Sequence, residues 1–328
     1  MRIAIVGTEL CAVDARGGGL ERVLLRWAEH LAARHEVAVV SVDRADDLPA
    51  ALRRIGPDLV SLHNRPQWSE LVPRPARCTV TFHNYPAAWM LEGTEAHRLP
   101  PVPASAVSGA LARAAEDRLG RPVGVTPPSI DPAFLEEAGL RPEPVVLSPN
   151  RLLRKKGVEV LLAVAGRPEF ASTTFAFADL ISPWARPTAE HRALRAAIDL
   201  VPNAVRFPPA GSAAELAERY RRSAVVACPV TEDEGLGLVA LEAQACGVPL
   251  VSVDLGGLRE ATFPPNRCVP PADPDALAAA LRLSFGRDPA AGDGPRQAVI
   301  ARHSPAVSGA TFEAWLEDVA AGDVRRGC

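Results

Sequence analysis

Residues 225–257 carry one continuous pattern of apolar strand, acidic glycine turn, helix and second strand, and this pattern restricts the fold more than any other stretch. Its first residues are apolar and largely β-branched, as a parallel strand buried on both faces requires. Gly235 and Gly237 let the backbone of the following turn pass close to a bound group. Apolar residues then recur at helical spacing up to Gly247. The stretch therefore predicts part of a parallel α/β sheet.

The acidic turn opens onto a helix N-terminus. Unpaired N–H groups and the positive end of the helix dipole favour an anionic or hydroxyl-rich ligand there. Glu234 lies in the turn, and Glu242 follows about two helical turns later. Both carboxylates are therefore predicted to reach a ligand lying over the helix end. The alternative is a merely solvated acidic start of a helix.

The segment Glu234-Gly-Leu-Gly-Leu-Val-Ala-Leu-Glu242, followed by Ala-Gln-Ala-Cys-Gly-Val-Pro, resembles the E-x7-E signature of retaining GT-B glycosyltransferases of family 4. The resemblance implies two facing Rossmann-like domains with a cleft between them, and a C-terminal helix that crosses back to the first domain. It also implies that Glu234 binds hydroxyls of the donor sugar, which makes it a candidate catalytic residue as well, and that Glu242 binds the ribose. Backbone N–H groups of the turn would bind the sugar and phosphate, namely those of Gly235, Leu236, Gly237 and Leu238.

The composition describes a globular chain with no strongly basic surface. A length of 328 residues suits two domains of ordinary size. The net charge of −3 argues against nucleic acid or an anionic membrane as a partner. The six cysteines are scattered without metal-binding spacing, which predicts a reducing, cytoplasmic location. No apolar run approaches the roughly 18 residues that a membrane-spanning helix needs.

Alternating strands and helices fill both halves of the chain, which predicts an α/β fold with doubly wound parallel sheets. The proline-rich residues 127–144 interrupt this periodicity and are predicted to contain the linker. We therefore expect an N-terminal, acceptor-side domain over residues 1–141 and a nucleotide-sugar donor domain over residues 142–307. Residues 308–328 would form the C-terminal helix that packs back on the first domain.

The turn Gly17-Gly18-Gly19 precedes a helix expected from about residue 20. Its position after the first strand resembles the phosphate-proximal glycine loop of the family, so Gly18 and Gly19 are candidate donor-binding residues. A long loop separates the turn from the strand, so it is not a GxGxxG fingerprint. An ordinary flexible turn is the alternative.

Arg151 and Lys156 lie in Ser-Pro-Asn-Arg-Leu-Leu-Arg-Lys-Lys-Gly, after the first strand expected in the second domain. This segment resembles the family's G-R-L-x-x-x-K-G, whose arginine and lysine hold the donor diphosphate. Departure of the sugar leaves extra negative charge on the nucleotide diphosphate, and an ammonium and a guanidinium stabilise that charge without a metal ion. A solvated basic turn is the alternative.

Two successive strands of the first half each end in His-Asn, at His63 and His83. The carboxyl ends of parallel strands border the ligand crevice of open α/β sheets, and the family has histidines at comparable strand ends, so both are candidate catalytic residues. A structural histidine at a strand end is the alternative. Four neighbouring polar or aromatic residues are candidates for the acceptor side: Asn64, Asn84, Tyr85 and Trp89.

One element typical of the family is replaced. Residues 174–181, Thr-Phe-Ala-Phe-Ala-Asp-Leu-Ile, stand where many relatives carry a V-G-x-G-P turn. Trp184 follows, and either stacks on a sugar or fills the core. No Asp-x-Asp motif stands at a strand end of the expected cleft, so we expect no metal ion and no other cofactor.

The resemblance implies a retaining glycosyltransferase, which we expect to be metal-independent. Its donor would be a UDP-, GDP- or dTDP-linked sugar, and its acceptor nucleophile would belong to a small molecule of specialised metabolism. Two alternatives of the same fold stay open, a nucleotide-sugar epimerase and a non-catalytic partner subunit of a glycosyltransferase. The sequence names neither the sugar nor the acceptor.

Overall fold

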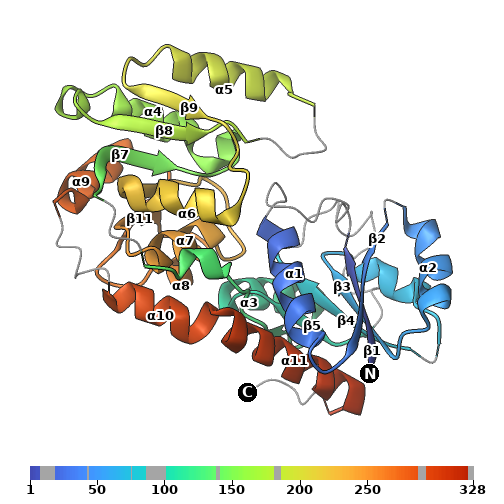
Figure 1. Ribbon diagram of the computed structural model, residues 1–328. Coiled ribbons are helices and arrows are strands. Elements are labelled where there is room, and N and C mark those ends of the chain that lie inside the picture. Colours follow the sequence, from blue (N-terminus) through green and yellow to red (C-terminus); the bar gives the residue numbers. More distant parts are fainter. Residues whose placement is uncertain are drawn as a thin grey trace. The chain divides into compact units, whose positions relative to one another are not determined.

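The structure, a computed structural model, describes residues 1–7, 19–42, 44–74, 76–85, 101–137, 141–180, 186–286 and 293–323. The chain divides into two compact units. Unit 1 comprises the described residues up to Ser129 and from Arg302 onward, and unit 2 those from Ile130 to Ala301. Each unit is built around one six-stranded sheet (Figure 1).

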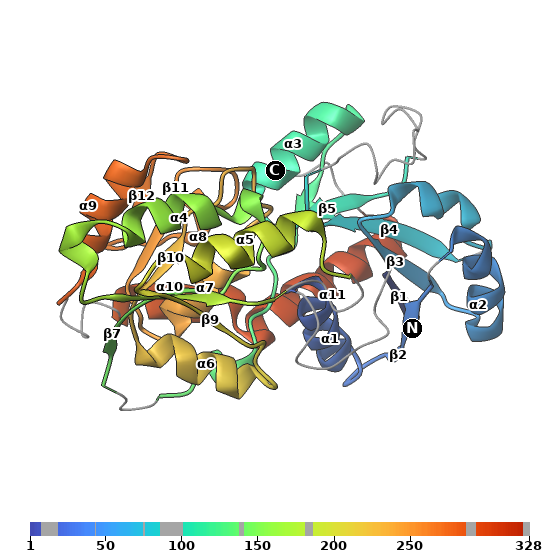
Figure 2. The same ribbon diagram turned by 90° about the horizontal axis from the view of Figure 1, so that it is seen from above.

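The sheet of unit 1 has the strand order β2-β1-β3-β4-β5-β6, and each neighbouring pair is parallel. Its strands are β1 (Arg2–Gly7), β2 (Glu36–Ser41), β3 (Leu59–His63), β4 (Arg77–Phe82), β5 (Ala104–Ala106) and β6 (Gly124–Val125). Its helices are α1 (Gly19–Leu31), α2 (Leu48–Ile55), α3 (Gly109–Leu119) and α11 (Pro305–Ala321). Figure 2 shows α3 and α11 on opposite sides of β4 and β5, so the sheet is covered on both faces.

The sheet of unit 2 has the order β12-β11-β10-β7-β8-β9 and is also parallel throughout. Its strands are β7 (Glu143–Ser148), β8 (Thr174–Ala178), β9 (Ala204–Phe207), β10 (Ser223–Cys228), β11 (Leu250–Val253) and β12 (Arg267–Val269). Its helices are α4 (Val158–Ala165), α5 (Ala189–Asp199), α6 (Ala213–Arg222), α7 (Leu238–Ala245), α8 (Leu258–Ala261), α9 (Pro274–Ser284) and most of α10 (Asp293–His303).

Both sheets reverse their winding direction at one internal position. In unit 1 the reversal lies between β1 and β3, and in unit 2 it lies between β10 and β7. The crevice outside the carboxyl ends of the strands at such a reversal is where open α/β sheets bind ligands. The topology thus singles out the segments that follow β3, β7 and β10.

Local sequence signals set several helix starts. Ser108 caps α3 by accepting a hydrogen bond from the Leu111 N–H, and Ser212 caps α6 in the same way. Asp273 accepts from two N–H groups at the start of α9. Each cap satisfies donors that the helix itself leaves unpaired. In this chain, a Ser, Thr or Asp that precedes apolar residues at helical spacing therefore marks the start of a helix.

Helix α11 is built into unit 1, as the sequence predicted. Phe312 stacks on Trp27 of α1, with ring centroids 4.0 Å apart. The Trp27 Nε1–H donates to Ser308 Oγ at 2.8 Å. Trp315 donates through Nε1 to Thr79 Oγ1 of β4 at 3.1 Å. The apolar face of α11 thus completes the core of unit 1 although it lies at the far end of the sequence.

The segment after Ser129 packs with unit 2, whereas the sequence placed the domain boundary after residue 141. Phe134 is fully buried and meets the ring of Tyr220 edge-on, with centroids 5.7 Å apart. Arg221 donates to the carbonyl of Ala133 at 2.6 Å. The proline-rich composition marked an interruption of periodicity, but burial of Phe134 decides which unit these residues join.

The sequence did not predict β12 or α10. β12 has three residues and its first two are exposed, so it does not show the alternation of apolar and polar residues that predicts a strand. α10 has a Gly and a Pro in its first turn and lacks a clear apolar face.

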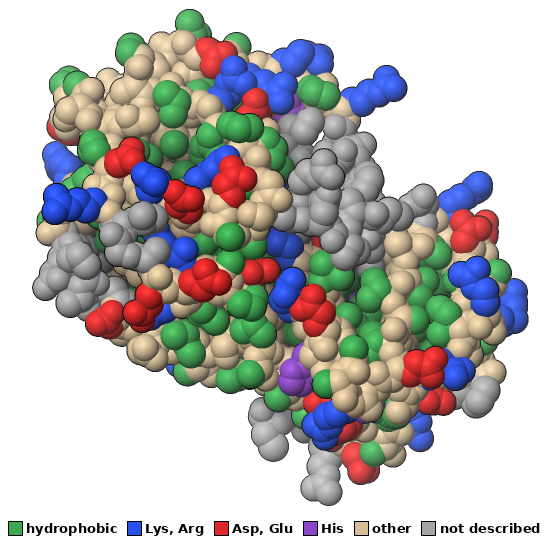
Figure 3. All heavy atoms as spheres, viewed as in Figure 1, with side chains coloured by type: hydrophobic (Ala, Val, Ile, Leu, Met, Phe, Trp, Pro, Cys, Tyr) green, Lys and Arg blue, Asp and Glu red, His purple; other side chains and the backbone are tan. Residues whose placement is uncertain are grey.

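Among the described residues, no helix combines the length and the apolar content that a membrane span requires. Acidic and basic side chains are interspersed over the face of the molecule shown in Figure 3.

We expect Gly309→Ala to destabilise unit 1, although alanine is intrinsically the better helix former. A Cβ at this position of α11 would lie 2.3 Å from Cγ of His30 on α1, and both positions belong to packed helices. Gly294→Ala in α10 is the matched control, because nothing lies within 4 Å of its Cβ. Thermal unfolding should show a lower Tm for Gly309→Ala and an unchanged or slightly higher Tm for Gly294→Ala. Equal Tm values for both variants would contradict the close packing of α1 and α11.

Candidate functional site

In unit 1, the two predicted histidines come together at the ends of adjacent strands. His63 is the last residue of β3, and His83 follows β4. His63 Nδ1 lies 2.9 Å from His83 Nε2, and the Ser61 hydroxyl lies 3.2 Å from His63 Nε2. His63 is buried and His83 is half-buried. Because each contact needs one donor, a single proton sits between the two imidazoles.

The histidine pair is electrically neutral. Burial lowers the pKa of His63 well below its ordinary value, and the neighbouring His83 lowers it further. Burial also lowers the pKa of His83, to about 3. The rings of Trp27 and Phe312 lie beside His63, with centroid distances of 6.0 and 6.1 Å, and provide the apolar surroundings. The pair can donate or accept hydrogen bonds near neutral pH but supplies no positive charge.

Asn64 connects the two strand ends. Its backbone is in the left-handed region, with φ of 58°, which asparagine tolerates better than most residues. Its Oδ1 accepts from the backbone N–H of His83 at 2.7 Å and of Asn84 at 3.4 Å. Asn64 therefore positions the segment that carries His83. Asn84 is exposed and Tyr85 half-buried, and the predicted acceptor residue Trp89 lies outside the described residues.

In unit 2, Lys156 and Glu234 come together from the two strands that flank the reversal of the sheet. Lys156 lies in the turn after β7, and Glu234 lies in the turn after β10. The Lys156 ammonium donates to Glu234 Oε2 and forms an ion pair with it. The two side chains are 12% and 25% exposed, so both are largely shielded from solvent. Arg151 of the same basic turn is exposed.

The second predicted carboxylate has a different partner. Glu242 lies inside α7, is 3% exposed, and accepts a hydrogen bond from the Tyr220 hydroxyl at 2.8 Å. Tyr220 is fully buried at the end of α6. Sequence reasoning did not single out Tyr220, although a buried phenol normally needs a polar partner. One of the two tyrosines of this chain thus orients the carboxylate of Glu242.

Glycines hold the backbone of this region close to its neighbours. Gly237 precedes α7 with φ of 93°, and a Cβ there would lie 2.4 Å from Leu258. Gly235 and Leu236 are buried, and α7 begins at Leu238. The first N–H groups of α7 have no partner within the helix. The turn and the helix start thus have the form that the sequence predicted.

Gly19 opens α1, and Gly18 and Trp184 lie outside the described residues.

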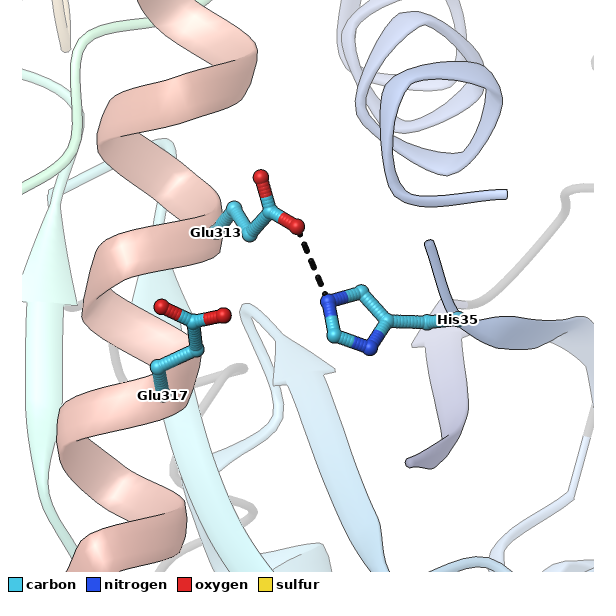
Figure 4. Close-up of side chains that lie close together, drawn as sticks. All are labelled: His35, Glu313 and Glu317. Atoms are coloured by element: carbon cyan, nitrogen blue, oxygen red, sulfur yellow. Dashed lines mark hydrogen bonds and ion pairs between the residues drawn. The ribbon is translucent and has the colours of Figure 1, made fainter. Parts of the chain in front are cut away.

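A third cluster contains potential metal ligands. His35, Glu313 and Glu317 of unit 1 each offer one ligand atom, and these atoms lie within 4.8 Å of one another (Figure 4). Glu313 is already bound, because His35 Nε2 lies 2.9 Å from its Oε1, and His30 and Arg34 each approach its Oε2 at 3.2 Å. The cluster therefore joins α11 to α1 and the turn that follows it.

The existing contacts of His35 and Glu313 argue against a cation in this cluster. A metal ion on His35 Nε2 would displace that nitrogen from its contact with Glu313 Oε1 at 2.9 Å. The guanidinium of Arg34 beside Glu313 would also repel the cation. The donor set fits a neutralised ion-pair cluster better than a metal centre.

Comparison with known proteins gives a family for part of the chain. Residues 134–286 match the family model described as "Glycosyl transferases group 1". The matched stretch contains Lys156, Glu234 and Glu242, and supports that family for unit 2. A D-inositol 3-phosphate glycosyltransferase of Kineococcus radiotolerans is 42% identical over 127 residues, which are 34% of this chain and 28% of that protein. The aligned part thus spans less than a third of this curated relative.

Two solved structures share the fold over nearly the whole chain. A sucrose-phosphate synthase of Thermosynechococcus elongatus has a TM-score of 0.82 at 20% identity, covering 98% of this chain and 100% of that one. The Anabaena protein HepE, in complex with UDP-glucose, has a TM-score of 0.77 at 16% identity, covering 97% and 100%. These similarities confirm the predicted two-domain α/β fold of GT-B glycosyltransferases.

The histidine pair should stay neutral over the whole physiological pH range. We expect the ring resonances of His63 and His83 not to titrate between about pH 8 and about pH 5 in nuclear magnetic resonance spectra. Because both folded pKa values are lowered, the unfolded chain takes up more protons as pH falls below about 6.5. Stability should therefore fall on acidification, by about 1.4 kcal/mol for each pH unit and each histidine. The double variant His63→Asn, His83→Gln should lose this part of the pH dependence in urea unfolding. A titration of either ring near pH 6.5 would contradict the neutral pair.

The Glu313 cluster should contribute stability rather than bind metal. Burial by itself raises the pKa of the Glu313 carboxyl, but hydrogen bonds from His30 and His35 and the charge of Arg34 outweigh it, so the pKa lies below its ordinary value. The contribution is therefore present above about pH 4.3 and is lost as pH falls further through the folded pKa. Glu313→Gln should cost about 1 to 3 kcal/mol at neutral pH, measured by urea unfolding.

Glu317→Gln is the matched control, because Glu317 is exposed and should change stability little. Added Zn²⁺ should leave the Tm of the unmodified protein unchanged. A rise in Tm with Zn²⁺ that disappears in Glu313→Gln would establish a metal site instead.

Proposed function

We propose that the protein is a retaining, metal-independent glycosyltransferase of family 4, with the E-x7-E pair Glu234 and Glu242. It would transfer a sugar from a nucleotide-diphosphate donor to an acceptor nucleophile, which we take to be a small molecule of specialised metabolism. The observation that carries the proposal is the meeting of Lys156 and Glu234 at the reversal of the unit 2 sheet. That meeting lies within the stretch that matches the glycosyltransferase family.

The chemistry of unit 2 suits the donor. A cation is needed where the leaving diphosphate gathers charge, and Lys156 and Arg151 are the two cations of the turn after β7 that we assign to it. Hydroxyl groups of the sugar would donate to Glu234, whose side chain is partly exposed. Glu242, oriented by Tyr220, would accept from the ribose. The N–H groups from Gly235 to Leu238 would contact the sugar and phosphate.

Unit 1 would bind the acceptor. His83 would contact the reacting hydroxyl. One proton would lie between His83 Nε2 and His63 Nδ1. Because the pair is neutral, its role is to accept or donate a hydrogen bond. Asn64, Asn84, Tyr85 and Trp89 are the proposed acceptor-side residues, and Gly18 and Gly19 the proposed glycine loop. With the boundary moved to Ser129, we keep the acceptor role for unit 1, which includes the returning helix, and the donor role for unit 2.

The donor is proposed to be UDP-, GDP- or dTDP-linked. The complexes of HepE with UDP and with UDP-glucose support a UDP-sugar as the first to test. We also propose a cytoplasmic location, from the cysteine pattern; the described Cys78, Cys228, Cys246 and Cys268 are free thiols. An epimerase and a non-catalytic subunit are not favoured, since the matched family model is described as glycosyl transferases.

Incubation with a panel of labelled nucleotide sugars tests the activity. Slow release of free sugar in the absence of acceptor supports a transferase, whereas conversion to an epimeric nucleotide sugar identifies an epimerase. Lack of any turnover with every donor would overturn the proposed function. Excess chelator should leave turnover intact, and loss of activity restored by Mg²⁺ would exclude the metal-independent mechanism.

Lys156→Ala should lower kcat/KM by about 10- to 100-fold, because a hydrogen bond to a charged group contributes about 1.5 to 3 kcal/mol. Lys155→Ala is the matched control: Lys155 is the other lysine of the chain and is exposed. Its removal should change kcat/KM by less than about 2-fold, since exposed charges contribute little. Steady-state kinetics at fixed acceptor measure both. Equal losses in the two variants would show only a general charge effect.

A further inference from the structure

The two residues that are proposed to hold opposite ends of the donor are bonded to each other in the ligand-free protein. Lys156 is assigned to the diphosphate and Glu234 to the sugar, yet the Lys156 ammonium donates to the Glu234 carboxylate. Both side chains are largely shielded, at 12% and 25% exposure. A ligand therefore cannot use Lys156 without changing the surroundings of Glu234.

The backbones that carry the pair are fixed in place. The Thr231 N–H donates to the Lys155 carbonyl at 2.9 Å, which ties the turn after β10 to the turn after β7. The Gly257 N–H donates to the Glu234 carbonyl at 2.8 Å. Because both turns are anchored next to the paired residues, the ion pair opens through its side chains rather than by separation of the two turns.

No other ionised group at this position takes up the charge of Lys156 in the described chain. The thiol of Cys228 lies close enough to feel both charges, but burial, followed by the charge of Glu234, raises its pKa to about 12. It therefore stays neutral, and Asn150 donates to its sulfur at 3.8 Å. Glu234 is the carboxylate that the structure pairs with Lys156. Removal of that one charge would leave the ammonium available to an anion.

The free-energy cost of opening the Lys156–Glu234 ion pair differs between a bare diphosphate and a nucleotide sugar. A bare diphosphate replaces Glu234 as the partner of Lys156 but leaves a shielded carboxylate without a donor, next to added negative charge. A nucleotide sugar brings the diphosphate together with hydroxyl donors, which satisfy the carboxylate at the same time. The cost of opening the pair is thus offset only by the complete donor.

We propose that the Lys156–Glu234 ion pair makes this site select a nucleotide sugar over the bare nucleoside diphosphate, and that it re-forms when the sugar leaves and so displaces the diphosphate product. The inference rests on the proposed function and goes beyond it, because it assigns Glu234 a second role in selectivity and product release. It requires no covalent step beyond sugar transfer.

Glu234→Gln tests the inference, because it removes the charge and keeps the size of the side chain. Calorimetry with UDP, GDP and dTDP identifies the base that the unmodified protein binds. With that nucleotide, the Kd of Glu234→Gln should fall by about 10- to 100-fold, the equivalent of one charged hydrogen bond made available. The Kd of the corresponding nucleotide sugar should not fall, so the preference for the sugar-bearing ligand should collapse. Glu234→Ala should show the same tightening for the bare nucleotide.

Asp233→Asn is the matched control. It removes one negative charge from the exposed neighbouring position and should change nucleotide affinity by less than about 2-fold. Tightening equal to that of Glu234→Gln would show an effect of net charge and overturn the role of the pair. Unchanged or weaker nucleotide binding in Glu234→Gln would also overturn it. If neither the unmodified protein nor Glu234→Gln bound any nucleoside diphosphate or nucleotide sugar, the proposed function itself would fail, which distinguishes the two outcomes.

Discussion

The candidate donor site depends on two places where backbone touches backbone. Gly157 has φ of 75°, and a Cβ there would lie 1.8 Å from the carbonyl oxygen of Pro229. A Cβ at Gly257 would lie 2.2 Å from the carbonyl oxygen of Gly235. Any other residue at Gly157 would push apart the turns after β7 and β10, because a carbonyl oxygen cannot approach a Cβ so closely. In the same way, any other residue at Gly257 would push the segment after β11 away from the turn after β10. The meeting of the Lys156 and Glu234 side chains therefore rests on glycines that bear no chemistry themselves.

Unit 1 builds its strand ends on a row of buried polar groups. The hydroxyl of Ser105 lies 3.0 Å from the hydroxyls of both Thr81 and Thr126, which joins β4 and β5 to the residue after β6. The Ser61 hydroxyl meets His63 on β3 in the same manner. Buried polar groups of this kind are tolerated because each has a partner. Covered by the stack of Trp27 and Phe312, the histidines are desolvated and lose their charge.

The sequence predicted the elements that carry periodic or motif signals. The two sheets and the turn before α7 follow from alternation, spacing and glycine positions, whereas the return of α11 was implied by the family resemblance. The sequence placed His63 and His83 at two strand ends, but it did not predict that they contact each other. The partners of the charged groups could not be predicted. Tyr220 reaches Glu242 from another helix, and Lys156 lies 78 residues before Glu234 in the chain, so no local pattern encodes either contact. The residues after Ser129 were misplaced for the same reason, since the burial of Phe134 depends on distant side chains.

The two units supply different kinds of chemistry, and this limits what each can do in the proposed reaction. The imidazoles of unit 1 are neutral because protonation would bury a charge in apolar surroundings. They cannot compensate charge on a leaving diphosphate, so that task falls to the cations of unit 2. There the ammonium of Lys156 is already neutralised by Glu234, and the site offers little net charge to a stray anion. The ammonium of Lys156 becomes available when hydroxyl groups of a ligand replace it as hydrogen-bond donors to the Glu234 carboxylate. Selectivity for the donor then arises from a contact that exists before the donor binds.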